Sequence, residues 1–553
     1  MNLIKLTIAL LSMPIIIFGQ APDNWFHMDS ADGYLGVSSD KAYSELLNGK
    51  TSQTVVVAII DSGMDAEHED LADNMWVNTD EIPGNGIDDD RNGYIDDIHG
   101  WNFIGGANGN VNADTYEVTR LYKKYKYKYE DADVAQLSKK DKAEYAKFKI
   151  YEAAVKAELD KANSRLSKYN DQKTQLIGGI NALELAMGDK EITLENLSTI
   201  EANTDEVVMG MNIATNVLGE TGEIESFDQL RDMIDAELEG AISYYQGVKD
   251  HAYNIDFNPR TIVGDDYSNS SERFYGNNDV EGPDALHGTH VGGIVGAVRN
   301  NGIGMNGVAD NVKLMSIRTV PNGDERDKDV ANAIRYAVDN GASIVNMSFG
   351  KGYSWDKGVV DAAMQYAAKN DVLLVHAAGN AGQNNDISDN FPNDKAKKKK
   401  LFGPKISKNW IEVGALSFKQ GADSPATFSN YGKTQVDIFA PGVSIYATTP
   451  DDNYAPLQGT SMAAPVVAGV AAMVRSYYPK LSARQVKELL LSTSVKLNDQ
   501  VVIPGTDGDK IAFSSLSATG GVVNAYNAIK AASTIKGKRK KKFMTSTKYT
   551  PKA

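Results

Sequence analysis

The 553-residue chain contains no cysteine. This absence excludes disulfide bonds, a thiolate nucleophile, a zinc site with cysteine ligands and a lipid-modified N-terminal cysteine. The fold must therefore be stabilised by packing, hydrogen bonds or bound ions. Because 42% of the residues are hydrophobic and 24% are charged, the chain has enough apolar material for a core, as ordinary globular proteins do.

Long apolar runs are also scarce, and the N-terminus carries the one that matters. Lys5 precedes an apolar stretch at residues 6–18, which Pro14 interrupts, and Gly19 offers a small residue for cleavage. This pattern is typical of a secretory signal peptide and too short for a spanning helix. We expect residues 1–20 to be removed and the mature chain to be secreted, to the periplasm, cell surface or medium, without a membrane span. An uncleaved anchor is the alternative.

Positive charge is in deficit, because 57 lysine and arginine residues face 73 aspartate and glutamate residues, a net charge of −16. Such a balance argues against nucleic-acid partners and against anionic membranes. One basic run, KGKRKKK at residues 536–542, stands out. Runs of like charge are typically disordered. We therefore expect residues 536–553 to be a disordered tail, with a nucleic-acid or surface-binding patch as the alternative.

Apolar, β-branched runs alternate with helical stretches over most of the chain. The runs are typical of strands buried on both faces, and they lie at residues 54–60, 312–317, 342–347 and 372–376. Helical patterns lie at residues 329–340 and 359–369. This order predicts an α/β fold with a parallel central sheet flanked by helices. Reactive groups are then expected where strands end and in the loops that follow.

Between residues 114 and 254 the composition shifts to Lys, Glu and Tyr. Apolar residues recur there at steps of three, four and seven, for example at Phe148 and Val155. The spacing predicts amphipathic helices that pack on one another, although Gly178 and Gly179 weaken it. The expected segments are a signal peptide at 1–20, an α/β domain at 21–113 and 255–535, an inserted helical subdomain at 114–254 and a basic tail at 536–553.

Asp61 directly follows the first predicted strand, in IDSG at residues 60–63. An aspartate there also caps turns. Asp-Ser-Gly occurs in aspartic proteases as well, but those enzymes need two facing carboxylates, and the chain has no second copy of the motif. Asp61 alone is therefore a weak signal.

His287 and His290 stand three residues apart in HGTHVG, at residues 287–292. The usual zinc-protease pair has i, i+4 spacing with an intervening glutamate, which this segment lacks. We interpret His287 as a general base and His290 as a structural neighbour, with a zinc pair as the alternative.

Ser461 lies in GTSMAAP at residues 459–465, just before an Ala-rich helical stretch. A hydroxyl residue at such a position is often only a helix N-cap. The same position exposes the hydroxyl at the positive end of the helix dipole, which favours developing negative charge. Asp61, His287 and Ser461 each have a structural explanation alone, but their combination does not.

Together the three segments resemble those of the subtilisin-like serine proteases, or subtilases, over roughly residues 54–105 and 255–530. The order Asp, His, Ser is that of subtilisin, and HGTHVG and GTSMAAP are long, specific matches. The resemblance implies a subtilisin-like fold and an endopeptidase for protein or peptide substrates. It also implies a catalytic triad of Asp61, His287 and Ser461, in which Ser461 forms an acyl-enzyme.

Two further segments fit this resemblance. VHAAGN at residues 375–380 is similar to the family's oxyanion segment, which implies that Asn380 donates its amide to the tetrahedral oxyanion. IVNMSFG at residues 344–350 is similar to the substrate-binding strand, whose edge is expected to pair with an extended peptide. The residues of that edge are Ser348, Phe349 and Gly350.

The acidic stretch NGIDDDRNGYIDD occupies residues 85–97. Oxygen-bearing side chains alternate at its centre and Gly93 permits a sharp turn, a spacing similar to the first half of an EF-hand calcium loop. His99 stands where the bidentate glutamate of that loop belongs. We expect a structural Ca²⁺ site here, with a solvated acidic turn as the alternative. The expected ligands are Asp88, Asp90, Asn92, Asp96 and Asp97.

Two functions of other classes stay open. One is a binding or scaffold protein on a subtilase fold that has lost activity; the presence of all four expected catalytic residues argues against it. The other makes the helical insertion the functional part, through substrate gating or partner binding, with proteolysis secondary. The simplest interpretation of the insertion is a packed surface addition without chemistry.

Overall fold

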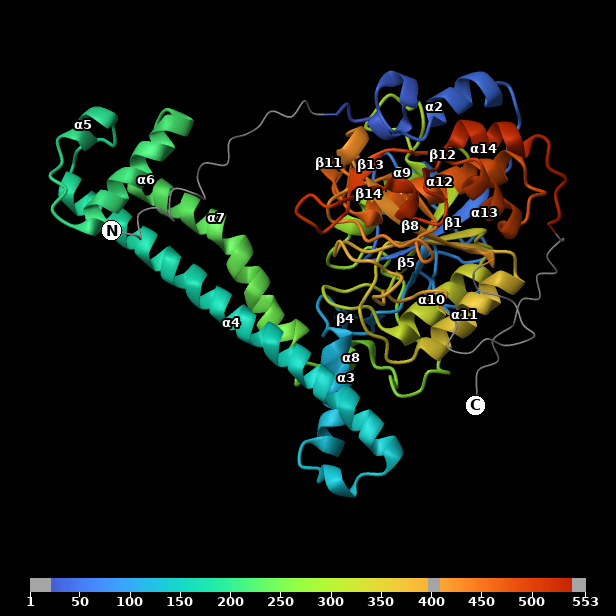
Figure 1. Cartoon of the computed structure of the whole chain (residues 1–553), viewed down its shortest axis with the longest axis horizontal. Helices are drawn as coiled ribbons and strands as arrows, with labels where there is room; N and C mark the ends of the chain where they lie inside the picture. The colour runs from blue at the N-terminus through green and yellow to red at the C-terminus, as the bar shows by residue number, and fades with distance from the viewer. Residues whose placement is uncertain (1–20, 396–407, 540–553) are drawn as a thin grey trace. The chain divides into compact units, whose positions relative to one another are not determined.

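The computed structural model describes residues 21–395 and 408–539 and divides into two compact units (Figure 1). One unit comprises the described residues up to Asn112 and from Pro259 onward, and the other comprises Ala113–Asn258. We call them the sheet unit and the helical unit. The expected signal peptide and residues 540–553 of the expected basic tail lie outside the described residues.

The sheet unit is built on a nine-stranded sheet in the order β12-β15-β9-β8-β7-β6-β1-β5-β2. Neighbouring strands are parallel except β12, which runs antiparallel to β15. The predicted α/β class with a parallel central sheet is confirmed. The strands are β1 Val55–Asp61, β2 Gly100–Asn102, β5 Val312–Arg318, β6 Ile344–Met347, β7 Leu373–Ala377, β8 Trp410–Leu416, β9 Ile438–Pro441, β12 Val495–Lys496 and β15 Gly521–Val522.

Helices cover both faces of this sheet, which is why its central strands are continuous apolar runs. In β1, Val57 and Ile59 join one core and Ala58 and Ile60 the other, as the two-residue period of a strand requires. The first core is shared with α9 Leu286–Gly296, α12 Thr460–Tyr477, α13 Ala483–Ser492 and α14 Ala525–Ala532. The second is shared with α10 Asp327–Asp339 and α11 Lys357–Lys369.

The chain upstream of β1 also contributes to the first core. Trp25 and Phe26 are fully buried there, and Trp25 Nε1 donates to the Ser444 carbonyl at 3.0 Å. The remaining short elements of the sheet unit are α2 Ser39–Lys41, α8 Arg260–Val263 and three hairpins: β3 Gly105–Gly106 with β4 Gly109–Asn110, β10 Ile445–Thr449 with β11 Asn453–Leu457, and β13 Gln500–Val502 with β14 Lys510–Ala512.

The helical unit is organised around one long helix, α4, of 49 residues. It continues through the two glycines that weaken its pattern. A Cβ on Gly210 of α6 would lie 2.3 Å from the Gly179 carbonyl oxygen, so Gly179 and Gly210 together allow α4 and α6 to approach closely. The helices are α3 Glu117–Tyr129, α4 Lys139–Met187, α5 Leu194–Ser198, α6 Asp205–Thr221 and α7 Phe227–Gly247.

Within residues 21–395 and 408–539, no helix combines the length and the apolar character needed to cross a bilayer.

Candidate active site

Asp61 and His287 form a close pair at the edge where the parallel strands end. Asp61 is the last residue of β1 and His287 the second of α9. His287 Nδ1 lies 2.6 Å from Asp61 Oδ1, and the Ser62 backbone N–H donates to the same oxygen at 2.8 Å. Because Asp61 is only 2% exposed, its carboxylate is held in one orientation and shielded from water.

Asp61 also controls the basicity of His287. Burial acts to lower the pKa of His287, but the charge of Asp61 and its hydrogen bond outweigh burial and raise that pKa above its ordinary value. Because Nδ1–H donates its hydrogen bond to the Asp61 carboxylate, Nε2 is the ring nitrogen that can accept a proton. His290 differs: burial lowers its pKa to about 4, and its Nε2 lies 3.0 Å from the Ala455 carbonyl oxygen, a structural contact.

Two glycines allow this pair to form. Gly63 has a φ of 130°, and a Cβ there would lie 1.9 Å from the Glu281 carbonyl oxygen. A Cβ on Gly288 would lie 1.9 Å from the Gly63 carbonyl oxygen. A side chain at Gly63 would displace the loop at Glu281, and one at Gly288 would push the start of α9, and His287 with it, away from the end of β1.

Ser461 is the second residue of α12, where the helix dipole favours negative charge. Its Oγ donates to the Ser348 carbonyl at 3.0 Å, and Ser348 Oγ donates to the Ser461 carbonyl at 2.8 Å. In the part of the chain that the structure describes, no hydrogen bond joins Ser461 to His287. Catalytic hydrogen bonds often tighten only in the substrate complex. The structure thus joins Asp61 to His287 and joins Ser461 to Ser348.

Asn380 follows β7, and Thr460 fixes its side chain. Asn380 Oδ1 accepts from the Thr460 backbone N–H at 2.8 Å and from Thr460 Oγ1 at 2.9 Å. A Cβ built on Gly459 would lie 3.4 Å from Asn380 Nδ2 and 3.5 Å from Ser461 N. The two nitrogens expected to donate to the oxyanion therefore lie within about 7 Å of each other, on either side of Gly459. Thr460 was not predicted; its only signal was its place beside Ser461, where a hydroxyl residue reads as a helix cap.

The expected substrate edge follows β6. Ser348 is buried, Phe349 half-buried and Gly350 exposed. The next residue, Lys351, anchors the edge by exchanging two backbone hydrogen bonds with Phe391, at 3.0 and 2.8 Å. Among the described residues, the N–H and C=O groups of Phe349 and Gly350 have no partner in the turns and loops. These groups are therefore free to pair with an extended peptide.

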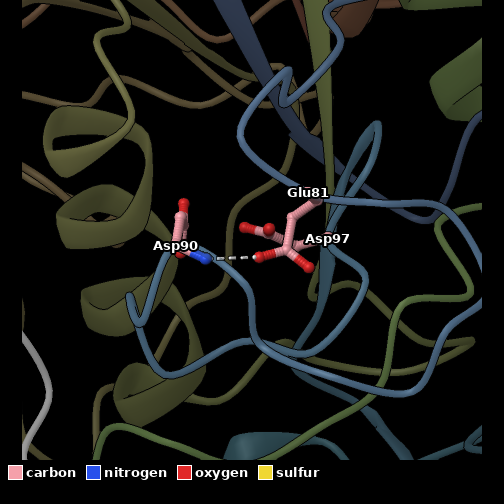
Figure 2. Close-up of side chains that lie close together, drawn as sticks. All are labelled: Glu81, Asp90 and Asp97. Atoms are coloured by element: carbon pink, nitrogen blue, oxygen red, sulfur yellow. Dashed lines mark hydrogen bonds between the residues drawn. The ribbon is translucent and has the colours of Figure 1, made fainter.

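A cluster of carboxylates lies in the acidic loop before β2. Glu81, Asp90 and Asp97 each offer one oxygen, and these oxygens lie within 4.8 Å of one another (Figure 2). Burial raises the pKa of Glu81 and Asp90 and raises the pKa of Asp97 to about 7. Because burial opposes several negative charges in one place, a cation fits this donor set. Carboxylate oxygens are the ligands that Ca²⁺ prefers.

Three of the five expected calcium ligands lie outside this cluster and hydrogen-bond within the loop, as Asp90 and Asp97 of the cluster also do. Asp88 accepts from the backbone N–H groups of Asn92 and Gly93 at 3.0 and 2.9 Å. Asn92 in turn donates to two nearby carboxylates, and Asp96 accepts from two backbone N–H groups at the start of the loop. The other two expected ligands belong to the cluster. Glu81 was not predicted, because it lies outside the acidic run and only folding brings it there.

The family model for the subtilase family matches residues 52–509. Thermophilic serine proteinase from Bacillus sp. (strain AK1) is 34% identical over 244 residues, which cover 44% of this chain and 52% of that protein. Subtilisin DY from Bacillus licheniformis is 38% identical, covering 38% of this chain and 72% of that protein. Thermitase from Thermoactinomyces vulgaris is 35% identical, covering 44% and 74%.

The matches cover different shares of each relative's length. The chain spans about half the length of the thermophilic proteinase and nearly three quarters of the other two. The family match, in contrast, extends over most of the chain. This protein belongs to the subtilase family.

Proposed function

We propose that this chain is a secreted serine endopeptidase that cleaves protein or peptide substrates through a triad of Asp61, His287 and Ser461. The observation that carries the proposal is the 2.6 Å contact between Asp61 and His287. The convergence of the Asn380 and Ser461 donors supports it, as does the family, whose named relatives are serine proteinases. Secretion rests on the N-terminal signal pattern.

The reaction begins when Ser461 Oγ gives its proton to His287 Nε2 and attacks the peptide carbonyl carbon. For this step the Ser461 hydroxyl must break its hydrogen bond to the Ser348 carbonyl and form one to His287 Nε2. The new C–O bond leaves a negative oxygen, which accepts from Ser461 N–H and Asn380 Nδ2. Asp61 holds the Nδ1 proton and stabilises the imidazolium.

His287 then gives its proton to the amine as the C–N bond breaks, and an ester on Ser461 remains. Water attacks the carbonyl carbon of this ester while His287 takes a proton from the water. The second tetrahedral intermediate then collapses: the bond between the acyl carbon and Ser461 Oγ breaks, His287 returns the proton to Oγ, and the acid product leaves. The free backbone groups of Phe349 and Gly350 would hold the substrate as an added strand, which keeps the scissile carbonyl beside Ser461.

We also propose that Glu81, Asp90 and Asp97 hold a structural Ca²⁺. The ion would neutralise buried charge and tie the acidic loop together in a chain without disulfides. Nothing in the reaction steps above depends on it.

The test is labelling of the purified protein with a fluorophosphonate probe, which reacts with activated serines. Wild type should be labelled, whereas Ser461→Ala and His287→Ala should not. Ser348→Ala is a useful comparison, because Ser348 contacts Ser461 but carries no proposed proton transfer. A folded wild type that is not labelled, with or without calcium, would favour an inactive scaffold.

A further inference from the structure

A buried cation beside Asp61 has no part in the steps above. Arg318 is the last residue of β5, and the strand register places it opposite Asp61 of β1. It is 1% exposed. Burial lowers the pKa of Arg318 to about 10, and no carboxylate among the described residues forms an ion pair with it. A buried guanidinium without a paired carboxylate is costly, so its location calls for an explanation.

The guanidinium of Arg318 joins three separate segments. Its Nε donates to the Ser62 carbonyl at 2.7 Å. One terminal nitrogen donates to the Val111 carbonyl at 2.6 Å, and the other lies 3.4 Å from Asn102 Oδ1. Only the rigid, forked donor set of arginine can satisfy acceptors in three directions at once.

The contact with Ser62 leads directly to the triad. Ser62 N–H donates to Asp61 Oδ1, the same oxygen that contacts His287. Ser62 is thus held at its carbonyl by Arg318 while its amide holds the catalytic carboxylate. The two residues after Arg318 hold the Asp61 backbone as well, because Thr319 N and Val320 N donate to the Asp61 carbonyl at 2.9 and 3.1 Å.

The surrounding backbone is shaped around this side chain. Gly282 has a φ of 66°, and a Cβ there would lie 2.2 Å from Arg318 Nε. The Arg318 side chain therefore packs directly against the backbone of Gly282, which restricts its position. Such confinement suits a group that sets the orientation of its neighbours.

We propose that Arg318 is a positioning residue of the triad, which holds Ser62 and thereby fixes the Asp61 carboxylate against His287. The inference rests on the proposed peptidase function, since it assigns Arg318 a part in that reaction. It reacts with nothing itself and touches no substrate.

The test compares Arg318→Met and Arg318→Lys with a matched control, Arg475→Met. Arg475 is also fully buried, its pKa is also lowered to about 10 by burial, and it also donates to backbone carbonyls, those of Ser343 and Asp371. Unlike Arg318, it also pairs with the Asp371 carboxylate, at 2.6 Å. It lies 14 residues beyond Ser461 on the same helix, or roughly 20 Å. Losing either arginine costs stability, but only Arg318 contacts the Asp61 segment.

Arg318→Met should lower kcat by about 100-fold, the scale of a small misplacement of catalytic groups, with KM for a short peptide unchanged. Its acid limb of kcat/KM should move to lower pH, because a looser Asp61 contact removes what raises the pKa of His287; Asp284 also acts on His287 but is untouched. Arg318→Lys, with one donor group in place, should recover part of kcat. Equal kcat per labelled serine in Arg318→Met and Arg475→Met would overturn the proposal.

An NMR titration of the His287 ring separates this inference from the proposed function, because it needs no turnover. A lower pKa of His287 in Arg318→Lys than in wild type supports positioning even if the protein cleaves no peptide. If the wild type is active but the pKa of His287 is the same in wild type and in Arg318→Lys, the proposed role of Arg318 is overturned while the peptidase function stands. Should Arg318→Met fail to fold, the lysine variant carries both measurements.

Discussion

The strand ends of the sheet unit and the seam between α4, α6 and α7 of the helical unit contain different kinds of side chain. At the strand ends of the sheet unit, polar groups meet in fixed pairs, such as the buried Asp61 with His287 and the buried Thr460 with Asn380. Between α4, α6 and α7 the helical unit instead encloses an apolar cluster that includes Leu183 and Leu230. Buried polar groups with fixed partners are what chemistry requires, whereas an apolar seam needs only helical spacing. A substitution at the strand ends should therefore remove activity, whereas one in the apolar seam of the helical unit should remove stability.

The largest expected effect lies at the nucleophile. Ser461→Ala should reduce kcat by about a millionfold, the loss seen when the triad serine of subtilisin itself is removed. The measurement is peptide hydrolysis with product detection sensitive enough for that range. Leu183→Ala in the helical unit is the matching control: it should destabilise that unit by about 2–5 kcal/mol and leave kcat for a short peptide unchanged.

The next effect sharpens the assignment of the oxyanion donors. Asn380→Ala should lower kcat by about 100- to 1,000-fold with little change in KM, because this donor acts on charge that develops only in the transition state. Thr460→Val, which removes the hydroxyl that accepts from Gly379 and donates to Asn380, should give a smaller loss of the same kind. A rise in KM without a fall in kcat would assign Asn380 to substrate binding instead.

Two glycines at close contacts offer a direct test of the comparison. Gly288→Ala would set a Cβ against the Gly63 carbonyl, and Gly210→Ala would set one against the Gly179 carbonyl. Both should lower the midpoint of urea unfolding. Only Gly288→Ala should also lower kcat, because it moves the start of α9 that carries His287. Equal kcat in the two folded variants would argue that the position of α9 does not limit catalysis.

Calcium should stabilise the sheet unit through Glu81 and Asp97. With free Ca²⁺ at about 100 times its dissociation constant, the gain is about 2.7 kcal/mol, or a melting temperature higher by about 3–4 °C for a unit of this size. Calorimetry with and without a chelator measures it. Glu81→Gln should remove most of the difference, whereas the exposed Asp73→Asn should leave it intact. A calcium effect that survives Glu81→Gln would place the ion elsewhere.

The smallest expected effect is a pH dependence of stability. Burial lowers the pKa of His27 and of His290 from 6.5 to about 4. Below about pH 6.5 the unfolded chain binds more protons at these residues than the fold does, so stability falls between about pH 6.5 and pH 4. Urea unfolding at pH 7 and pH 4.5 measures this loss. His290→Gln, which keeps a donor for the Ala455 carbonyl, should reduce it. The helical unit contains one histidine, His251, which is half-buried.

Local patterns predicted four of the nine strands of the sheet, β1, β5, β6 and β7, and singled out the residues of the proposed site. A strand covered on both faces leaves an unbroken apolar run, so β1 and β5 could be placed within about two residues. The segments around His287 and Ser461 could be recognised because each of these residues lies at the start of a helix and is flanked in sequence by small residues.

Contacts between distant residues were not predictable in this way. Glu81 joins the carboxylate cluster only through the fold of the loop, and Thr460 orients Asn380 from 80 positions away. Arg318 reaches Ser62 across 256 positions. Gly179 read as a weak point in a helix, because the close packing of α6 that offsets its low helix propensity appears only in three dimensions.

The central claim is that Ser461 becomes acylated during peptide-bond cleavage. The most direct measurement is rapid acid quenching of the protein with a peptide ester, followed by mass spectrometry of the digested enzyme. The account predicts an acyl group on the peptide that contains Ser461, formed in a burst and absent from His287→Ala. Hydrolysis without any acyl group on Ser461, or an acyl group on another residue, would contradict it.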